Sequence, residues 1–334
     1  MGAVRPPVAA PAGTPARGLD PTAPDVSVVI PTWNRIDTLP EVLAGLAGQQ
    51  RAPAFEVIVV DDGSTDDTPR WLAARPADDL ALRSLRQANR GPAAARNAGV
   101  AVARGRWVAF LGDDTVPSPG WLGRLYDALE RRGDADTAVI GRIEWHSRMR
   151  LTPFLRHINE NGAQFGFALI EDPNDVPFNF FYTSNLCLPR RLLVEEPFDE
   201  TFPYPAWEDI ETAYRLKAKG MRLTYEPGAL VRHHHPTDLG RFCQRQERAG
   251  YSAVVFYQRH PELGPMLGLT PSGPPAPLGW RWRAGELMAR ALQRVPLLPV
   301  VTPKLWDEVL RGHYILGLHR GWAERVRATE GDAS

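Results

Sequence analysis

Acidic side chains follow two separate hydrophobic, strand-like runs. Asp61 and Asp62 come directly after residues 57–60, and Asp113 and Asp114 follow a second such run, 107–111, after a single glycine. In an open parallel sheet the carboxyl ends of the strands lie along one edge, so we expect these four carboxylates to converge there. A group of carboxylates needs a cation, and a divalent metal carrying a diphosphate meets that need. The pattern predicts a nucleotide site.

The composition is that of an ordinary globular protein. The chain has 334 residues, 43% hydrophobic and 23% charged, enough for one large domain with an appendage. Lys+Arg and Asp+Glu each number 39, so no net basic charge favours nucleic acid as a partner. The two cysteines, Cys187 and Cys243, have no metal-binding or disulfide spacing, which favours buried thiols in a reducing compartment.

The chain shows no sequence signal for export or membrane insertion. Residues 1–24 are rich in Pro and Ala and lack the apolar segment of a secretory signal, so we expect a disordered tail. No apolar run approaches the roughly 18 residues that span a bilayer. We therefore expect a cytoplasmic protein, with a position at the inner face of the membrane left open.

Strand-like and helix-like segments alternate over the first part of the chain. A right-handed βα alternation predicts a doubly wound, mostly parallel sheet over about the first 115 residues. Thr38 and Glu41 have the spacing of a capping box at the first helix. The expected strands are 26–30, 57–60, 80–86 and 107–111, and the expected helices are 38–49, 67–74 and 93–103.

The alternation ends after Asp114. Residues 149–179 contain Pro, Asn and Gly throughout and predict an irregular lid or acceptor-binding segment, although packing alone would also account for its aromatic residues. Beyond residue 238 the pattern is helical, with a proline-rich link at 271–277. The remaining expected elements are helices at 121–131 and 208–219 and strands at 137–145, 182–188 and 222–232.

A set of motifs in order over residues 26–236 resembles a known enzyme family. The motifs are PTWNR, VVDDGSTDD, NRGPAAARNAG, FLGDD, TSNLCLPRRLL, FDETFPYPAWEDIETAYRLKAKG and ALVRHHHP. Together they resemble the family-2 glycosyltransferases with the GT-A fold, an α/β, Rossmann-like sheet. The resemblance implies a domain at 25–236, with a nucleotide-binding half (25–115) and a mixed acceptor-binding half (116–236). A helical extension, 237–334, would follow.

The resemblance also implies an activity. Members of the family transfer a sugar, with inversion, from a nucleotide-diphosphate sugar to an acceptor hydroxyl, using Mg²⁺ or Mn²⁺. The product would be a polysaccharide, a glycolipid or another glycoconjugate. Two alternatives remain: a nucleotide-sugar-binding protein without transferase activity, and a sugar nucleotidyltransferase, although the latter's Gly-rich, lysine-bearing loop is missing from the sequence.

By resemblance, the donor-binding residues follow the parallel strands. Purely structural roles stay open for several residues of this region: Trp33 would cover the edge of the core, the Asp61–Asp62 pair would serve a turn and helix cap, and Arg96 would form an ion pair. The donor-binding set is Pro31, Thr32, Trp33, Arg35, Asp61, Asp62, Arg90 and Asp113.

The metal ligands implied by the resemblance are Asp114 and His233. The family carries an Asp-x-Asp signature, and here Gly112 takes the first acidic place, so a plain acidic turn remains an alternative. Strand alternation places His233 and His235 on one face and His234 on the other. A purely structural role for His233 also stays open.

Glu208 and Asp209 form the predicted catalytic pair. The resemblance implies that Asp209 takes the proton of the acceptor hydroxyl and that Glu208 orients it or binds the acceptor. Both start a predicted helix, where the helix dipole should keep them ionised. Favourable helix-start electrostatics alone would also account for the pair.

The segment after residue 237 combines apolar residues with many arginines. Leu287, Met288, Val309, Leu310 and Ile315 are among its apolar members. Such a face suits peripheral contact with an anionic membrane, a homodimer contact, or helices that simply cover the domain.

Overall fold

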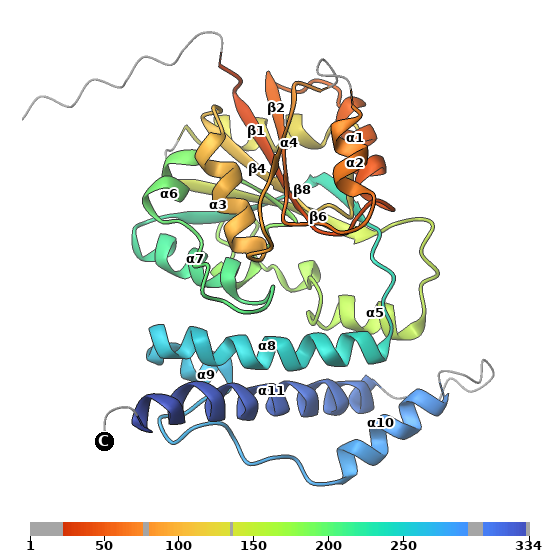
Figure 1. Ribbon diagram of the computed structural model, residues 1–334, viewed down its shortest axis with the longest axis vertical. Helices are drawn as coiled ribbons and strands as arrows, with labels where there is room; N and C mark the ends of the chain where they lie inside the picture. The colour runs from red at the N-terminus through yellow and green to blue at the C-terminus, as the bar shows by residue number, and fades with distance from the viewer. Residues whose placement is uncertain (1–22, 76–79, 134–135, 293–302, 332–334) are drawn as a thin grey trace, which may run out of the picture.

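The computed structural model describes residues 23–75, 80–133, 136–292 and 303–331. The predicted tail at 1–24 therefore lies almost wholly outside the described residues. One mixed sheet forms the upper part of the molecule, and a layer of helices lies below it (Figure 1). The strand order in the sheet is β3-β2-β1-β4-β7-β6-β8-β5.

The first half of the sheet is parallel, as predicted. β1 pairs in parallel with β2 and β4, and β2 pairs in parallel with β3, so the carboxyl ends of these four strands share one edge. The strands are β1 (Val26–Thr32), β2 (Phe55–Asp61), β3 (Leu82–Arg86) and β4 (Trp107–Leu111), and the helices between them are α1 (Leu39–Ala47), α2 (Thr68–Ala73) and α3 (Pro92–Val102).

The second half mixes directions. β7 lies between β4 and β6 and is antiparallel to both, while β6 and β8 are parallel and β5 is antiparallel to β8. The strands are β5 (Thr115–Pro117), β6 (Thr137–Trp145), β7 (Asn185–Pro189) and β8 (Arg222–His233); the helices are α4 (Trp121–Glu130), α5 (Pro153–Glu160), α6 (Arg190–Glu195) and α7 (Glu208–Ala218).

Two local predictions were wrong. The Thr38 hydroxyl does not cap α1; it donates to the carbonyl of Asp113, 2.9 Å away, because the end of β4 lies beside the start of this helix. The segment 149–179 is not wholly irregular, since it contains α5 and two short 3₁₀ turns. Thr152 caps α5 by accepting a hydrogen bond from the amide of Leu155 at 3.2 Å.

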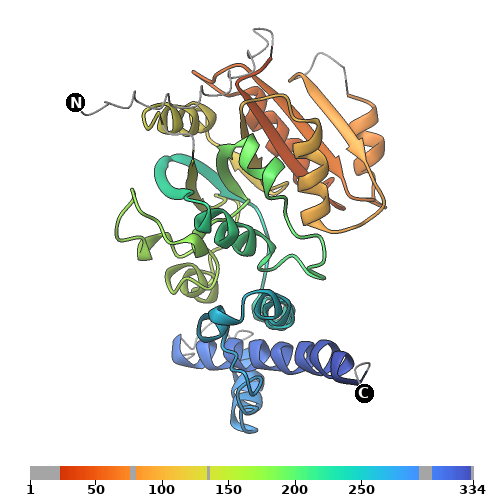
Figure 2. The same ribbon diagram turned by 90° about the vertical axis from the view of Figure 1, so that its left-hand side faces the viewer.

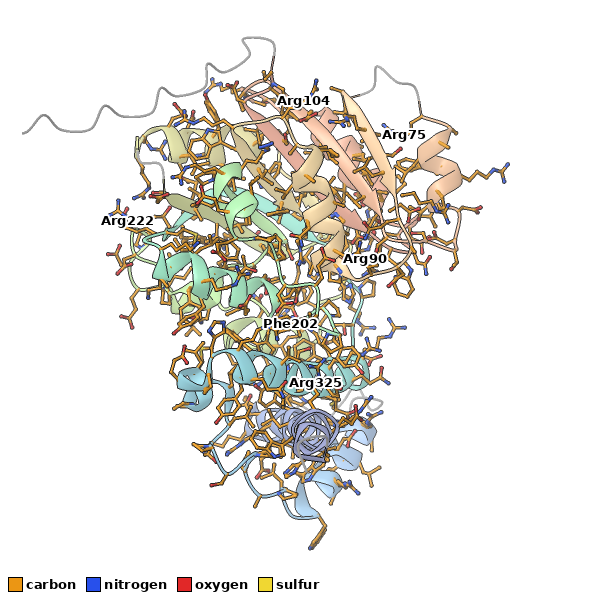
Figure 3. All side chains as sticks on the ribbon, turned by 60° about the vertical axis from the view of Figure 1, so that its left-hand side comes forward. Arg75, Arg90, Arg104, Phe202, Arg222 and Arg325 are labelled. Atoms are coloured by element: carbon orange, nitrogen blue, oxygen red, sulfur yellow. The ribbon has the colours of Figure 1, made fainter. Side chains whose placement is uncertain are left out.

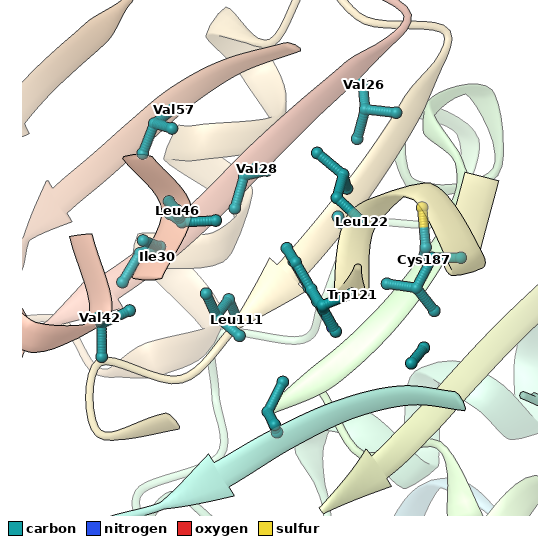
Figure 4. Packing of buried hydrophobic residues seen from close by; sticks show 14 of the residues in the cluster. Val26, Val28, Ile30, Val42, Leu46, Val57, Leu111, Trp121, Leu122 and Cys187 are labelled. Atoms are coloured by element: carbon teal, nitrogen blue, oxygen red, sulfur yellow. The ribbon is translucent and has the colours of Figure 1, made fainter. Parts of the chain in front are cut away.

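The core lies on both faces of the sheet. Val26, Val28 and Ile30 of β1 belong to one buried cluster (Figure 4). Val29 belongs to the cluster on the other face, as strand alternation requires. Trp121 of α4 fills the first cluster, and its indole donates to the buried Asn185 side chain at 2.7 Å. This packing fixes the strand ends that carry the acidic residues.

The C-terminal helices form a separate layer below α5 and α7 (Figures 1 and 2). α8 (Leu239–Arg259) and α11 (Pro303–Gly331) run side by side in the same direction, joined through α9 (Gly264–Leu267) and α10 (Arg281–Leu292). A Cβ at Gly250 would lie 2.0 Å from the Tyr314 carbonyl oxygen, and one at Gly317 would lie 2.0 Å from that of Glu247. Glycine is therefore what lets the two helix backbones touch. No helix among the described residues is long and apolar enough to cross a bilayer.

Candidate functional site

The acidic residues after β4 meet a cation from the loop after β1. The Arg35 guanidinium lies between the two carboxylates, with Nε 3.4 Å from Asp113 Oδ1 and Nη2 3.6 Å from Asp114 Oδ2. Pro31 and Thr32 end β1, and Thr32 is directly paired with Asp61. Trp33 is 53% exposed and so does not cover the edge of the core. The loop after β1 thus presents an indole and a guanidinium at the predicted nucleotide edge.

Asp61 and Asp62 hold the backbone around them. Asp61 Oδ1 accepts from the amide of Ser64 at 2.8 Å. The Asp62 carboxylate accepts from the Gln87 side chain at 2.8 Å and from the amides of Arg90 and Gly91 at 2.9 and 2.8 Å. These hydrogen bonds correspond to the structural role in a turn and a helix cap that the sequence left open for this pair. They leave Asp113 and Asp114 as the acidic groups beside the Arg35 side chain.

Arg90 and Arg96 both form ion pairs. The Arg90 guanidinium pairs with Glu200 and is largely exposed, on the side of the sheet nearer the C-terminal helices (Figure 3). Arg96 Nη1 donates to Glu208 Oε1 at 2.8 Å, and both side chains are buried. Arg96 thus forms the structural ion pair that the sequence left open, and its partner, Glu208, is a member of the predicted catalytic pair.

Asp114, His233 and His235 form a candidate metal centre. Asp114 Oδ1 lies 3.4 Å from His233 Nε2, and Asp114 Oδ2 lies 3.0 Å from His235 Nδ1. Their potential ligand atoms all lie within 4.8 Å of one another. His233 Nδ1 is buried and has no hydrogen-bond partner among the described residues. One carboxylate and two imidazoles in this arrangement fit a divalent cation.

The two neighbouring aspartates differ strongly in acidity. Burial raises the pKa of Asp113 to about 7, helped by the charge of Asp114 and opposed by Arg35. Burial also acts to raise the pKa of Asp114, but His233, His235 and Arg35 outweigh it and hold that pKa well below its usual range. Asp114 is therefore the group of this pair that stays ionised and can bind a cation.

Gly112 marks the one departure from the family signature. A Cβ at this position would lie 3.1 Å from Thr115 Oγ1 and 3.3 Å from Asp114 Oδ1. The Thr115 hydroxyl is itself held by the Gly112 carbonyl at 2.9 Å. A side chain at 112 would therefore press on Asp114, whereas glycine leaves that carboxylate free to approach the two histidines.

Asp209 lines a large cavity beside this edge. The cavity has a volume of about 690 Å³, and its wall includes Glu208, Asp209 and the segment 182–184. Thr183 and Ser184 connect the two regions: the amide of Thr183 hydrogen-bonds Asp209, and the carbonyl of Ser184 accepts from the amide of Gly112 at 3.2 Å. The predicted base and the predicted metal centre are thus tied to the same short segment.

The ionisation of Asp209 differs from the prediction. Burial and the charge of Glu208 raise the pKa of Asp209 to about 7, against the opposing effects of Arg96 and the nearby amides. The helix dipole does not keep this carboxylate fully ionised, because the dipole contributes only about 0.3–1 kcal/mol. A pKa near neutrality is nevertheless suited to a general base.

Trp207 sets the position of this pair. Its φ of 74° is in the left-handed region, which is costly for an aromatic residue, and its indole donates to the Ala249 carbonyl of α8 at 2.9 Å. The turn that starts α7 is therefore anchored to the C-terminal layer. Such strain is commonly found next to functional residues.

Sequence reasoning missed several residues that line these sites. His235 could have been found, because alternation had placed it on the same face as His233. Arg245 of α8 and Arg311 of α11 line the cavity, but no local pattern connects them with residues far away in the chain. His234 was correctly placed on the opposite face, where its ring stacks on His146 at 4.9 Å.

The chain is similar to proteins of known name. A Pre-mycofactocin glycosyltransferase of Mycobacterium tuberculosis is 31% identical over 246 residues, 72% of this chain and 49% of that protein. A Validoxylamine A glucosyltransferase of Streptomyces hygroscopicus subsp. limoneus is 29% identical over 294 residues, 76% of this chain and 60% of that protein. The chain thus spans only about half to three-fifths of these relatives.

Solved structures share the fold. A mannosyltransferase from Pyrobaculum calidifontis, solved with GDP-Man and Mn²⁺, superposes with a TM-score of 0.56 at 21% identity over 92% of this chain and 90% of that one. This likeness supports the GT-A fold. The model of the family described as "Glycosyl transferase family 2" matches residues 27–204, more than half of the chain. The protein therefore belongs to glycosyl transferase family 2.

Proposed function

We propose that this protein is an inverting, metal-dependent glycosyltransferase that moves a sugar from a nucleotide-diphosphate sugar to an acceptor hydroxyl. The observation that carries the proposal is the placement of Asp209. Its carboxylate has a pKa of about 7 and opens on a cavity of about 690 Å³ that adjoins the acidic strand ends. The product would be a polysaccharide, a glycolipid or another glycoconjugate.

The proposed donor site lies at the carboxyl ends of β1, β2 and β4. Trp33 would contact the nucleoside, Arg35 the phosphates and Asp113 the ribose, with Asp114, His233 and His235 holding the cation. The P. calidifontis enzyme was solved with GDP-Man and Mn²⁺, which supports a similar pairing here. Two imidazoles favour Mn²⁺ over Mg²⁺, because magnesium prefers oxygen ligands. A dication held there would offset the charge that develops on the departing diphosphate.

The proposed chemistry is one direct displacement. Asp209 accepts the proton of the acceptor hydroxyl while that oxygen forms a bond to the anomeric carbon of the donor. The bond from that carbon to the phosphate oxygen breaks, and its electron pair leaves with the nucleoside diphosphate. The amides of Ile210 and Thr183 hold the proton-accepting carboxyl in place, and Glu208, paired with Arg96, helps to raise its pKa. Attack from the face opposite the leaving group inverts the anomeric centre.

A thermal-shift screen tests the donor half of the proposal. UDP, GDP, TDP and their sugars are each added to the full chain with and without Mn²⁺. We expect one nucleoside diphosphate to raise the unfolding temperature only when the metal is present. Stabilisation by none of them, with or without metal, would overturn the donor assignment.

Replacement of Asp209 tests the catalytic half. Asp209→Asn should lower kcat by roughly 10²–10⁴-fold, the usual contribution of a general base, with the donor affinity little changed. Asp127→Asn, on the exposed side of α4, is the matched control and should leave transfer unaltered. Transfer that survives Asp209→Asn at the wild-type rate would exclude this residue as the base.

The same measurements separate the alternatives. A nucleotide-sugar-binding protein would show the metal-dependent shift but release no diphosphate from any sugar donor. A sugar nucleotidyltransferase would instead form a nucleotide sugar from a nucleoside triphosphate and a sugar phosphate.

A further inference from the structure

The C-terminal helices supply one wall of the cavity that contains Asp209. Arg245 comes from α8 and Arg311 from α11, and both line the cavity together with the loop after α5. α8 and α11 run in parallel, with Glu247 next to His313 and Gly250 next to Tyr314. The same offset along the two helices places Arg245 and Arg311 at the same level.

The other charged groups of the cavity wall, apart from Asp209, are already engaged in contacts within the protein. Arg96 is paired with Glu208 at 2.8 Å. Asp307 accepts from the Asn161 side chain at 2.8 Å and lies 2.8 Å from His157 Nε2. These contacts neutralise or share the charge of each group within the protein.

Arg245 and Arg311 form no salt bridge with any residue of the described ranges, although Asp209 and Glu208 act on the Arg245 charge from across the cavity. Arg245 Nη1 donates to the Gln164 amide oxygen, which is uncharged. Both side chains remain exposed to the cavity. A guanidinium presents a fork of donors that matches carboxylate and phosphate oxygens. Two guanidinium groups without salt bridges among the described residues therefore line one wall of the cavity.

We infer that the acceptor of this enzyme carries an anionic group, a carboxylate or a phosphate, which Arg245 and Arg311 bind while its hydroxyl lies at Asp209. The inference rests on the proposed transferase function and names its acceptor class. Charge on the acceptor would also orient it, because a paired contact at one end restricts which hydroxyl reaches the base.

The position of the two arginines favours the acceptor over the donor. None of Asp61, Asp62, Asp113, Asp114 and the two histidines belongs to the cavity wall that holds them. Asp209, the proposed base, belongs to that same wall, so the two arginines lie on the acceptor side of the proposed reaction.

Binding of paired sugars tests the inference. Methyl β-D-glucuronide, glucose 6-phosphate and uncharged methyl β-D-glucoside are titrated calorimetrically into the full chain, with Mn²⁺ and the nucleoside diphosphate chosen by the thermal-shift screen. We expect at least one charged sugar to bind about tenfold or more tightly than the glucoside, as hydrogen bonds between charged groups imply. The glucuronide and phosphate arms distinguish the two anions.

Variants locate the effect. Arg245→Gln and Arg311→Gln should each remove most of this preference and leave binding of the glucoside and of the nucleoside diphosphate unchanged. Arg248→Gln is the matched control on α8, because that guanidinium lies over the Tyr204 ring, 5.8 Å from its centroid, and outside the cavity wall. Thermal unfolding of each variant checks that the chain remains folded.

Three results would overturn the inference: equal binding of charged and neutral sugars, no binding of any of the three, or variants that weaken the nucleoside diphosphate in place of the charged sugar. Each of these differs from failure of the transferase proposal, in which no nucleoside diphosphate would stabilise the protein at all.

Discussion

Asp209 experiences opposing influences from its closest charged neighbours. The negative charge of Glu208 disfavours a negative charge on Asp209, and burial disfavours it as well. The positive charge of Arg96 favours it. Because burial and Glu208 prevail, the pKa of Asp209 reaches about 7, so the residue is protonated below neutrality and ionised above it. Only the ionised form can accept a proton from the acceptor.

The activity should therefore depend on pH with a definite sign. We expect kcat/KM to rise as the pH increases through about 7 and to level off above it, because the base becomes ionised there. A pH–rate profile at saturating Mn²⁺ measures this. A profile that is flat from acidic to neutral pH would contradict the assignment.

Glu208 provides a more specific test of the same balance. Glu208→Gln removes the repelling charge and leaves Arg96 unneutralised, so both changes lower the pKa of Asp209 and should move the rising limb toward lower pH. Loss of the buried ion pair should also reduce stability by about 3–5 kcal/mol, which chemical denaturation would measure. If the limb moves toward higher pH, Glu208 does not act on Asp209 in this way.

Among the elements, β8 ends at His233, and the alternation of its side chains continues through His234 and His235 at the candidate metal centre. His233 and His235 face Asp114, and His234 faces His146 and Glu41. Replacing either of the first two by Gln should weaken Mn²⁺ binding by at least the roughly tenfold that loss of an outer-shell partner of a ligand costs. His234→Gln is the control from the same run of three histidines and should bind Mn²⁺ normally. Calorimetry with the nucleoside diphosphate present makes the comparison, and equal losses in all three variants would refute the assignment.

The contact between α8 and α11 depends on glycine residues at the points where the two helix backbones touch. Gly317→Leu should separate the helices, since even a Cβ there would lie 2.0 Å from the Glu247 carbonyl oxygen. We expect destabilisation by about 1–3 kcal/mol or more, typical of overpacking. Gly279→Ala is the control, because its Cβ would meet nothing within 4 Å. Equal unfolding midpoints for the two variants would show that the close approach is dispensable.

Sequence periodicity predicted the positions of the strands and helices better than it predicted which strands pair and which side chains hydrogen-bond. Strands and helices of the parallel half were found because their hydrophobic repeats are local and strong. The antiparallel insertion of β7 between β4 and β6 was not, since pairing direction depends on contacts far apart in the chain. The Thr38 hydroxyl was misassigned for the same reason: its partner, Asp113, belongs to another strand end.

At the scale of the whole molecule, the C-terminal layer has an inner and an outer side. Val309, Leu310 and Ile315 are buried between helices, so these residues serve as covering core and are not free for a membrane or a second copy. The described outer surface around α10 keeps three large apolar side chains exposed, at 77% for Trp280, 71% for Leu287 and 52% for Met288. This is the part of the layer that a peripheral contact could use.

A liposome sedimentation assay tests that contact. We expect anionic vesicles to retain the protein and neutral vesicles to retain less, because arginines flank the apolar residues of α10. The double substitution Leu287→Ser and Met288→Ser should abolish retention without changing the unfolding midpoint. If wild-type protein stays in the supernatant with both kinds of vesicle, the surface has no such role.

The sequence predicted the strand-end part of the site but not the part that the C-terminal helices supply. Strand ends can be recognised by acidic residues after apolar runs, which is how Asp113 and Asp114 were predicted, whereas His233 was predicted through the family resemblance. The cavity wall from α8 and α11 was not, because Arg245 and Arg311 sit in helices whose arginines look alike until the chain is folded.

The carboxylate of Asp62 occupies the amides of Arg90 and Gly91, immediately before α3. Proteins that grasp nucleotides often leave such backbone donors open for the incoming phosphates. Here the Asp62 carboxylate occupies both donors, so in the proposed donor complex the diphosphate would depend on the metal ion and on Arg35 for its counter-charge. Binding of the nucleotide and binding of the dication should consequently be coupled, so that each binds weakly in the absence of the other.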